Sequence, residues 1–142
     1  MTPDVNVLVA ASRIDHPHHQ AARSWLEAAI SKAQSTPLTL QPMVIASFLR
    51  LVTHPKIFVN PTPMTDALKF MEALLQTPGV EQATLGSEYS ELARLCLEKS
   101  LSANDIPDAW LAAAAIDQGE HVVSFDSDFR RLLPKDQFTR LA

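Results

Sequence analysis

The chain has 142 residues, of which 46% are hydrophobic and 20% charged, so it can form the core of one folded domain and is not a disordered protein. Its 12 Lys and Arg against 16 Asp and Glu give a formal net charge of −4, which argues against a protein that holds nucleic acid by charge alone. A single cysteine excludes an internal disulfide, and with no long apolar run and no secretory signal we expect a soluble, cytoplasmic protein.

The first half of the chain contains one ambiguous segment, two predicted helices and a predicted strand. Val5–Ala10 is strand-like by residue type, although its apolar residues do not alternate cleanly. His18–Lys32 predicts a helix, because Pro17 suits a first turn and apolar residues recur on one face. Leu38–Leu40 predicts a short buried strand, and Pro42–Val52 predicts a second helix opened by its proline.

The second half alternates between helical and strand-like segments. The predicted elements are a helix over Thr65–Leu75, a strand over Val80–Leu85, a helix capped by Ser87, a buried helix over Pro107–Gln118 closed by Gly119, a strand over His121–Phe125, a short helical turn over Asp126–Leu133 and an edge strand over Phe138–Leu141. Short strands that alternate with helices indicate an α/β domain around a mainly parallel sheet. Ligands bind such sheets beyond the carboxyl ends of the strands.

Acidic residues occur at three places that this fold would bring to the binding edge. Asp4 lies near the first element, Asp105 and Asp108 enter the buried helix in NDIPDAW, and Asp126 and Asp128 follow a strand in SFDSDF. Taken singly, each is explained by turn chemistry or helix capping. Taken together, they would converge from distant segments at one edge of the sheet.

Converging carboxylates repel one another and need a cation to compensate their charge. Mg²⁺, or Mn²⁺ in its place, is the natural occupant because both ions prefer oxygen ligands. The chain has no suitably spaced Cys or His for zinc, so the chemistry that suits such a pocket is metal-dependent hydrolysis of a phosphodiester.

Three stretches resemble a known family: DVNVLVAAS, FLRLVTHP and DIPDAWLAAAAIDQG with HVVSFDSDF. They are similar to PIN-domain ribonucleases, specifically VapC-type toxins of toxin–antitoxin pairs, over nearly the whole chain. The resemblance implies one PIN domain over residues 1–142, with a Rossmann-like three-layer α/β/α fold and a short, mainly parallel central sheet. It also implies that Asp4 ends the first strand, so Val5–Ala11 would be loop and helix, and we adopt this prediction over the residue-type one.

The resemblance also assigns roles residue by residue. It implies that Asp4, Asp108 and Asp126 are the catalytic, metal-binding acids, with Asp128 as a further ligand or water-mediated contact. Asn6 and Ser124 match small polar positions that steady the acids and the substrate phosphate.

One position departs from the family pattern. PIN nucleases usually carry a glutamate just before the Phe-Leu-Arg stretch, and here that residue is Ser47. A serine can orient a water but contributes no charge. Either the aspartates suffice, with Asp105 helping, or metal affinity is reduced; a degenerate, non-cleaving domain is the remaining alternative.

The resemblance implies structured RNA as the substrate, with tRNA or ribosomal RNA loops the usual targets. The candidate RNA-binding cations are Arg50, which belongs to the family motif, and Arg13, Lys56, Arg130 and Arg131. The implied partners are a cognate VapB-type antitoxin that inhibits the enzyme and a second copy in a homodimer, with promoter DNA bound only through the antitoxin.

Other classes fit less well. A housekeeping RNA-processing nuclease on the same fold stays open, as does a metal-free adaptor. A phospho-receiver needs two adjacent acids after the first strand, and a DxDxT phosphatase needs an acid where Asn6 stands.

We interpret His16, His18 and His19 as a solvated first turn, and Trp25, Trp110 and Cys96 as packing residues. Met64, Leu68 and Met71 fit either the core or a partner surface.

Overall fold

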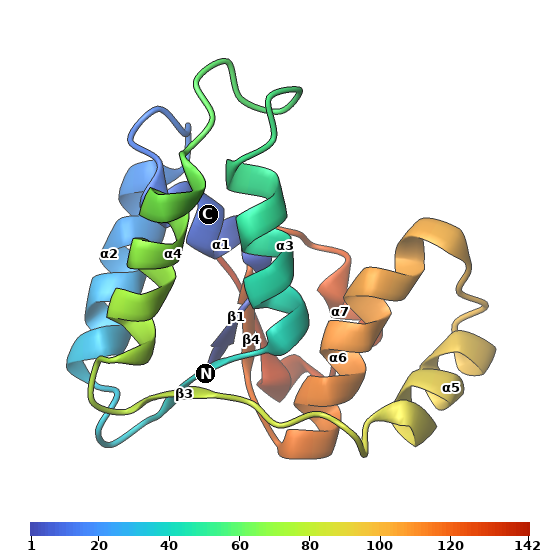
Figure 1. The fold of residues 1–142 in the computed structure, drawn as a ribbon. Helices are drawn as coiled ribbons and strands as arrows, with labels where there is room; N and C mark the ends of the chain where they lie inside the picture. The colour runs from blue at the N-terminus through green and yellow to red at the C-terminus, as the bar shows by residue number, and fades with distance from the viewer.

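The computed structural model describes residues 1–142 as strands and helices in alternation (Figure 1). The strands are β1 (Thr2–Pro3), β2 (Leu38–Leu40), β3 (Val80–Gln82), β4 (Val122–Ser124) and β5 (Phe138–Arg140). The helices are α1 (Val5–Ser12), α2 (His19–Ser31), α3 (Pro42–Val52), α4 (Met64–Leu75), α5 (Tyr89–Glu98), α6 (Ile106–Gln118) and α7 (Phe129–Leu132), with short 3₁₀ turns at Ala103–Asp105 and Lys135–Gln137.

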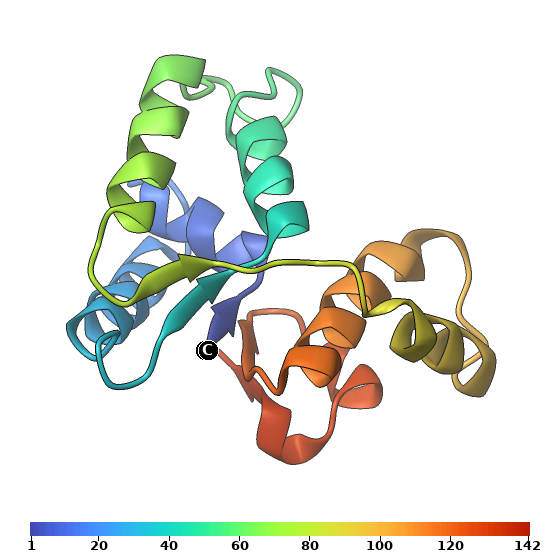
Figure 2. The same ribbon diagram turned by 60° about the horizontal axis from the view of Figure 1, so that its bottom comes forward.

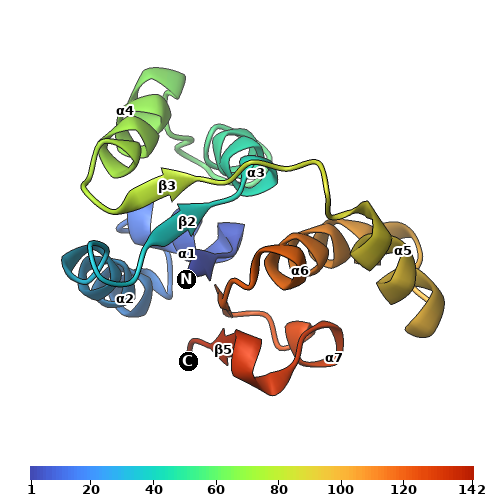
Figure 3. The ribbon, with the colours of Figure 1, turned by 90° about the horizontal axis from the view of Figure 1, so that it is seen from below.

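All strand pairs are parallel. β1, β4 and β5 form one sheet in that order, and β2 pairs with β3. The two groups are joined where the Thr39 N–H donates to the Met1 carbonyl at 2.8 Å and the Thr2 hydroxyl donates to the Thr39 carbonyl at 2.6 Å. The strands therefore lie in the order β3-β2-β1-β4-β5, with α2 on one side and α5, α6 and α7 on the other (Figures 2 and 3). The predicted α/β fold with a parallel sheet is confirmed.

The ambiguous first segment is a helix, and its strand-like residue types are misleading. Asp4 caps α1, because its Oδ1 accepts the Val5 N–H at 2.7 Å. The five residues Val7–Ala11 are buried, so α1 is an interior helix. Burial of valine and leucine against the sheet outweighs their preference for a strand, and the residue-type prediction for Val5–Ala10 is wrong.

The other elements lie within three residues of their predicted ranges, apart from two differences; α7 begins at Phe129, three residues after the predicted start of its turn. The strand predicted over Val80–Leu85 ends at Gln82, where its pairing with β2 stops. Ser87 does not cap α5, because that helix begins at Tyr89 and the Ser87 hydroxyl donates to Asp117 on α6 at 2.5 Å. That bond ties α5 to α6 instead.

One cluster of 26 buried apolar residues forms the core. It joins α1 and the strands to the buried faces of α2, α3, α4 and α6. Within α6 the run Leu111–Ala115 is buried throughout, as the sequence predicts, because alanines let this helix approach the sheet closely. No helix is long and apolar enough to cross a membrane.

Gly79 is the backbone position that the core constrains most tightly. Its φ of +84° lies in the left-handed region, and a Cβ atom there would collide with the backbone carbonyl of Ala33 at the end of α2. The Gly79 carbonyl accepts the Leu38 N–H at 3.0 Å, so this close approach sets β2 against β3.

We therefore expect Gly79→Ala to lower the free energy of unfolding by about 3 kcal/mol, because strain at φ and a backbone collision add. Gly119→Ala is the matched control, with a φ of +68° but open space around the Cβ position. It should cost only about 1 kcal/mol. Urea unfolding followed by circular dichroism measures both, and equal losses would contradict the collision.

Candidate active site

Asp4 lies at the carboxyl end of β1, next to the end of β4. The Asp4 N–H donates to the Val123 carbonyl at 2.8 Å, and the Ser124 hydroxyl donates to Asp4 Oδ2 at 2.7 Å. Only 6% of Asp4 is exposed. Burial raises the pKa of Asp4 above its ordinary value; the hydrogen bonds from Ser124 and Val5 oppose this rise, and the charge of Asp126 adds to it.

Ser124 organises the acids around it. Its oxygen accepts the Asn6 side-chain N–H at 3.0 Å and the Asp126 backbone N–H at 3.0 Å, while its own proton goes to Asp4. Asp126 Oδ1 in turn accepts the Asp128 N–H at 2.9 Å, which closes the turn into α7. The structure thus brings Asp4, Asn6, Ser124 and Asp126 into one network, with Asp128 exposed at its edge.

Asp108 approaches the same place from the first turn of α6. With Asp4 and Ser47 it lines a pocket of about 310 Å³. Burial raises the pKa of Asp108 to about 6, and the negative charges of Asp4, Asp126, Asp128 and Asp105 contribute further. These carboxylates therefore lie near enough to repel one another, although they come from opposite ends of the chain.

The donors in this pocket suit a hard divalent cation. In the side-chain positions of this structure, no three Asp, Glu, His or Cys side chains form a group ready to hold a metal ion. The shared three-aspartate ligand set that we predicted is therefore not preformed. Mg²⁺ usually takes one or two carboxylates and keeps several waters, and Asp4 and Asp108 are the two carboxylates that line this pocket.

The two remaining supporting positions differ in their placement. Ser47 on α3, the position at which the sequence resemblance predicts a glutamate, lies in the pocket wall beside Met43 and Val44. Asp105 does not line this pocket, because its side chain forms a capping box with Ser102 and accepts a hydrogen bond from Arg131 at 3.0 Å. The structure gives Asp105 a capping role in place of the predicted metal support.

The predicted RNA-binding cations differ in whether their side chains are free to contact RNA. Arg13 is only 8% exposed, and its guanidinium donates to Asp15, to Thr62 and to the Asn60 carbonyl while it lies 3.8 Å from the centre of the Phe58 ring. It holds the loop between α3 and α4 and is not available for the predicted RNA contact. Arg50 and Lys56 are exposed at and beyond the end of α3.

Two aromatic features of the site differ from the sequence interpretation. Trp110, predicted to pack inward, is 37% exposed and lines the pocket beside Asp108. His18 is exposed, as interpreted, but its ring also stacks on Phe125 with ring centroids 4.7 Å apart, a contact that the sequence interpretation lacked. Residues two apart on a helix point to different faces, so the spacing of Trp110 from Asp108 gave no signal for the first. The second depends on tertiary packing and has no local signal.

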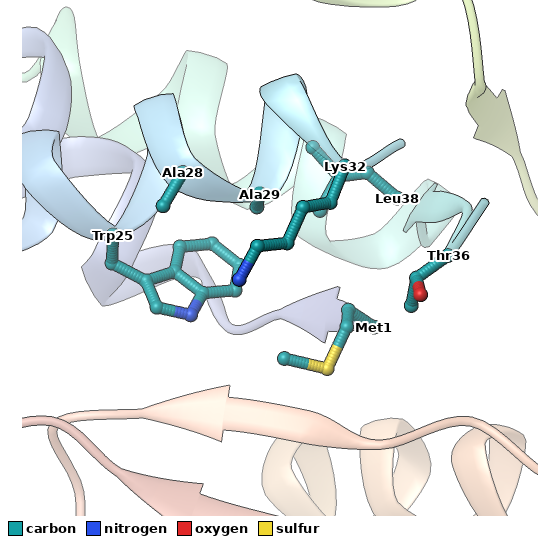
Figure 4. A pocket seen from close by; sticks show the side chains of 7 residues that line it. All are labelled: Met1, Trp25, Ala28, Ala29, Lys32, Thr36 and Leu38. Atoms are coloured by element: carbon teal, nitrogen blue, oxygen red, sulfur yellow. The ribbon is translucent and has the colours of Figure 1, made fainter. Parts of the chain in front are cut away.

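A separate pocket of about 210 Å³ lies at the amino end of the strands and is shown in Figure 4. Its side chains are Met1, Trp25, Ala28, Ala29, Lys32, Thr36 and Leu38. Trp25 therefore packs at a pocket wall, half-buried as predicted for a core-facing residue. No carboxylate lines this pocket.

Comparison with known proteins agrees with this architecture. Residues 1–132 match the family model of the PIN domain. The chain belongs to the PIN-domain family. The acids at the ends of β1 and β4 and at the start of α6 thus lie on a nuclease fold.

The most similar relatives that we compared all carry the name of one group of PIN-domain proteins. Ribonuclease VapC25 and ribonuclease VapC31 of Mycobacterium tuberculosis are each 43% identical over 129 residues, which cover 90% of this chain and 89% of theirs. VapC ribonuclease Mb2897 of Mycobacterium bovis is 36% identical over 90% of this chain and 86% of its own. Within the PIN family the chain is grouped with the VapC ribonucleases.

Solved structures show the same fold. VapBC2 from Rickettsia felis, bound to a DNA fragment from its promoter, matches with a TM-score of 0.70 and 18% identity over 99% of this chain and 98% of that one. VapC20 of Mycobacterium tuberculosis, a toxin that cleaves the sarcin–ricin loop, matches with a TM-score of 0.64 and 17% identity over 91% and 92% of the two chains.

The raised pKa of Asp108 gives a pH-dependent stability. A folded-state pKa above the ordinary value means that the folded protein binds this proton more tightly than the unfolded chain. The stabilisation is therefore complete below the ordinary pKa of 3.8 and is lost as the pH rises through about 6. Asp108→Asn removes this loss.

In chelator at about pH 7.5, Asp108→Asn should be more stable than wild type by about 1 kcal/mol, a figure reduced for partial solvent exposure. At about pH 4 the gain should vanish. Urea unfolding at both values measures it, and Asp136→Asn, an exposed acid outside the site, is the control. A gain of the same size at both values would contradict this account.

Proposed function

We propose that this chain is a metal-dependent endoribonuclease toxin that hydrolyses phosphodiester bonds in structured RNA, either tRNA or ribosomal RNA, and is inhibited by a cognate antitoxin. The observation that carries the proposal is the pocket in which Asp4 and Asp108 meet, with Asp126 tied to Asp4 through Ser124. The VapC names of the relatives favour a toxin over a housekeeping nuclease. We further propose that residues 1–142 act as one PIN domain, since a single apolar cluster runs through them.

Mg²⁺, or Mn²⁺ in its place, would activate water for attack on the phosphorus and stabilise the leaving oxygen. Asp4 and Asp108 are the acids that would hold it, and Asp126 and Asp128 would add negative charge at the edge. Ser124 keeps Asp4 in one orientation through its 2.7 Å hydrogen bond, and Asn6 fixes the Ser124 hydroxyl. Ser47 presents a neutral hydroxyl to the pocket, where it can orient water but not balance a cation.

The same proposal assigns partners to three surfaces. Arg50 and Lys56 would contact RNA near the end of α3, since both are exposed and neither forms an ion pair. A VapB-type antitoxin would bind the chain, mediate its contact with promoter DNA and cover the acids, an assembly suggested by the VapBC2 structure. Exposed apolar side chains on and before α4 are available for a homodimer, among them Met64 and Leu68.

A second candidate is a non-catalytic binding domain. It is favoured by Ser47 in place of the family glutamate, together with the lack of a preformed group of three acids. Such a domain would keep the acidic pocket as a binding feature and would leave RNA intact. The two candidates differ in one measurable activity.

Asp108→Asn should lower the rate of RNA cleavage by about 100-fold or more, because it removes a charge that would hold the metal ion. Purified wild type should cleave bulk tRNA or ribosomal RNA with Mg²⁺ or Mn²⁺ and not with EDTA. Asp136→Asn, which keeps the pocket intact, should cleave at the wild-type rate. Equal rates for wild type and Asp108→Asn, or no cleavage by wild type with either metal, would favour the non-catalytic domain.

Ser47→Glu should increase the affinity for Mn²⁺ by about 10-fold, because it adds a third carboxylate to the wall that Asp4 and Asp108 share. Titration calorimetry measures this affinity. Ser47→Gln has a similar size without the charge and serves as the control. An equal affinity for the two variants would mean that position 47 does not face the ion.

A further inference from the structure

A second charged feature lies beyond the acids, at the C-terminal edge of the sheet. Arg130, Lys135 and Arg140 line a pocket of about 380 Å³ together with Leu133 and Phe138. No acidic side chain lines it. A quarter of the 12 Lys and Arg of an acidic chain thus gather in one hollow. We call this set of lining residues the basic pocket.

The basic pocket adjoins the acids through β5. In the parallel pairing of β4 and β5, Arg140 is the register partner of Ser124, so it stands at the same carboxyl edge as the network around Asp4. The Arg140 Nε–H donates to the Phe125 carbonyl at 3.3 Å, directly before Asp126. Arg130 reaches the pocket from α7, which begins immediately after Asp128, and α7 and β5 are neighbours in Figure 3.

One wall of the basic pocket is held by aromatic packing, and its cationic side chains form no ion pairs within the chain. Phe138 and Arg140, two residues apart on β5, share a face of the strand, and the Phe138 ring packs 5.8 Å from the ring of buried Phe129 on α7. Arg130, Lys135 and Arg140 form no ion pair within the chain. The neighbouring Arg131, by contrast, is bonded to Asp105.

We propose that the basic pocket binds phosphates of the RNA strand beside the scissile bond, an inference that rests on the proposed function. A chain of net charge −4 with carboxylates at its active edge repels RNA, so a nearby cluster of unpaired cations is needed to hold the strand there. Three cations in a concave wall suit a run of phosphates. Lys135 and Arg140 lie beyond residues 1–132, which the PIN family model matches.

The test measures binding apart from cleavage. Fluorescence anisotropy with labelled bulk tRNA in EDTA compares wild type with the triple variant Arg130→Gln/Lys135→Gln/Arg140→Gln. Its control is Arg23→Gln/Lys32→Gln/Lys69→Gln, which makes the same change of net charge on α2, at its C-cap and on α4. Circular dichroism establishes that both variants are folded.

We expect the basic-pocket variant to bind tRNA about 10-fold or more weakly near 50 mM salt, with a salt-dependence slope smaller by about 2, as the loss of three phosphate contacts requires. The control should bind within about 2-fold of wild type. Equal losses in both triples, no measurable binding by wild type, or a loss seen with duplex DNA or anionic vesicles but not with tRNA would each overturn the proposal.

Cleavage distinguishes this inference from the proposed function. If wild type binds tRNA through the basic pocket but does not cleave it with Mg²⁺ or Mn²⁺, the proposed nuclease activity is wrong and the RNA-binding site is supported. If wild type cleaves, and the basic-pocket variant binds and cleaves equally well, only the proposed RNA-binding site is wrong.

Discussion

The hydrogen bond from Ser124 to Asp4 joins the two ends of the chain and orders the site around it. Asp4 follows β1 and Ser124 ends β4, and the two strands are neighbours in the sheet. The nearly buried carboxylate of Asp4 therefore lies beside the hydroxyl group of Ser124 and accepts its proton. Because that proton is directed to Asp4, the Ser124 oxygen accepts the N–H groups of Asn6 and Asp126. The relative positions of the two ends of the chain, residues 4–6 and 124–126, thus depend on one side chain that is fully buried.

The same arrangement stores electrostatic free energy. Asp4 and Asp108 both hold their protons more tightly than free carboxyls, chiefly because they are buried. Ionisation of such acids costs stability, and a bound cation would restore it, so under the proposed function folding and metal binding would be coupled. The neutral hydroxyl of Ser47 in the pocket wall would limit this coupling, because it adds no negative charge to attract the ion.

The sequence predicted the parallel α/β fold and the elements at whose ends the acids lie. Hydrophobic periodicity indicates which face of each element is buried, and the prolines indicate where elements begin and end. It did not distinguish a strand from a helix over Val5–Ala10 by residue type, since a buried helix and a buried strand are both rich in valine. The role of Arg13 was also beyond reach. The stacking of Arg13 on Phe58 joins residues 45 positions apart, and no local pattern encodes it. The capping box of Asp105 with Ser102 spans only three residues, so the helix-capping interpretation of this acid was available from the sequence.

Arg13 fixes one part of the loop between α3 and α4 and leaves another part exposed. It follows α1, whose first residue is capped by Asp4, and its guanidinium fastens the Asn60–Thr62 stretch of the loop before α4. Ile57 and Val59, in the same loop, are 49% and 97% exposed and take no part in that fastening. The loop therefore has a fixed base and a solvent-exposed tip. Substitutions of the side chains at the tip should leave the base of the loop, and the carboxylate at the other end of α1, in place.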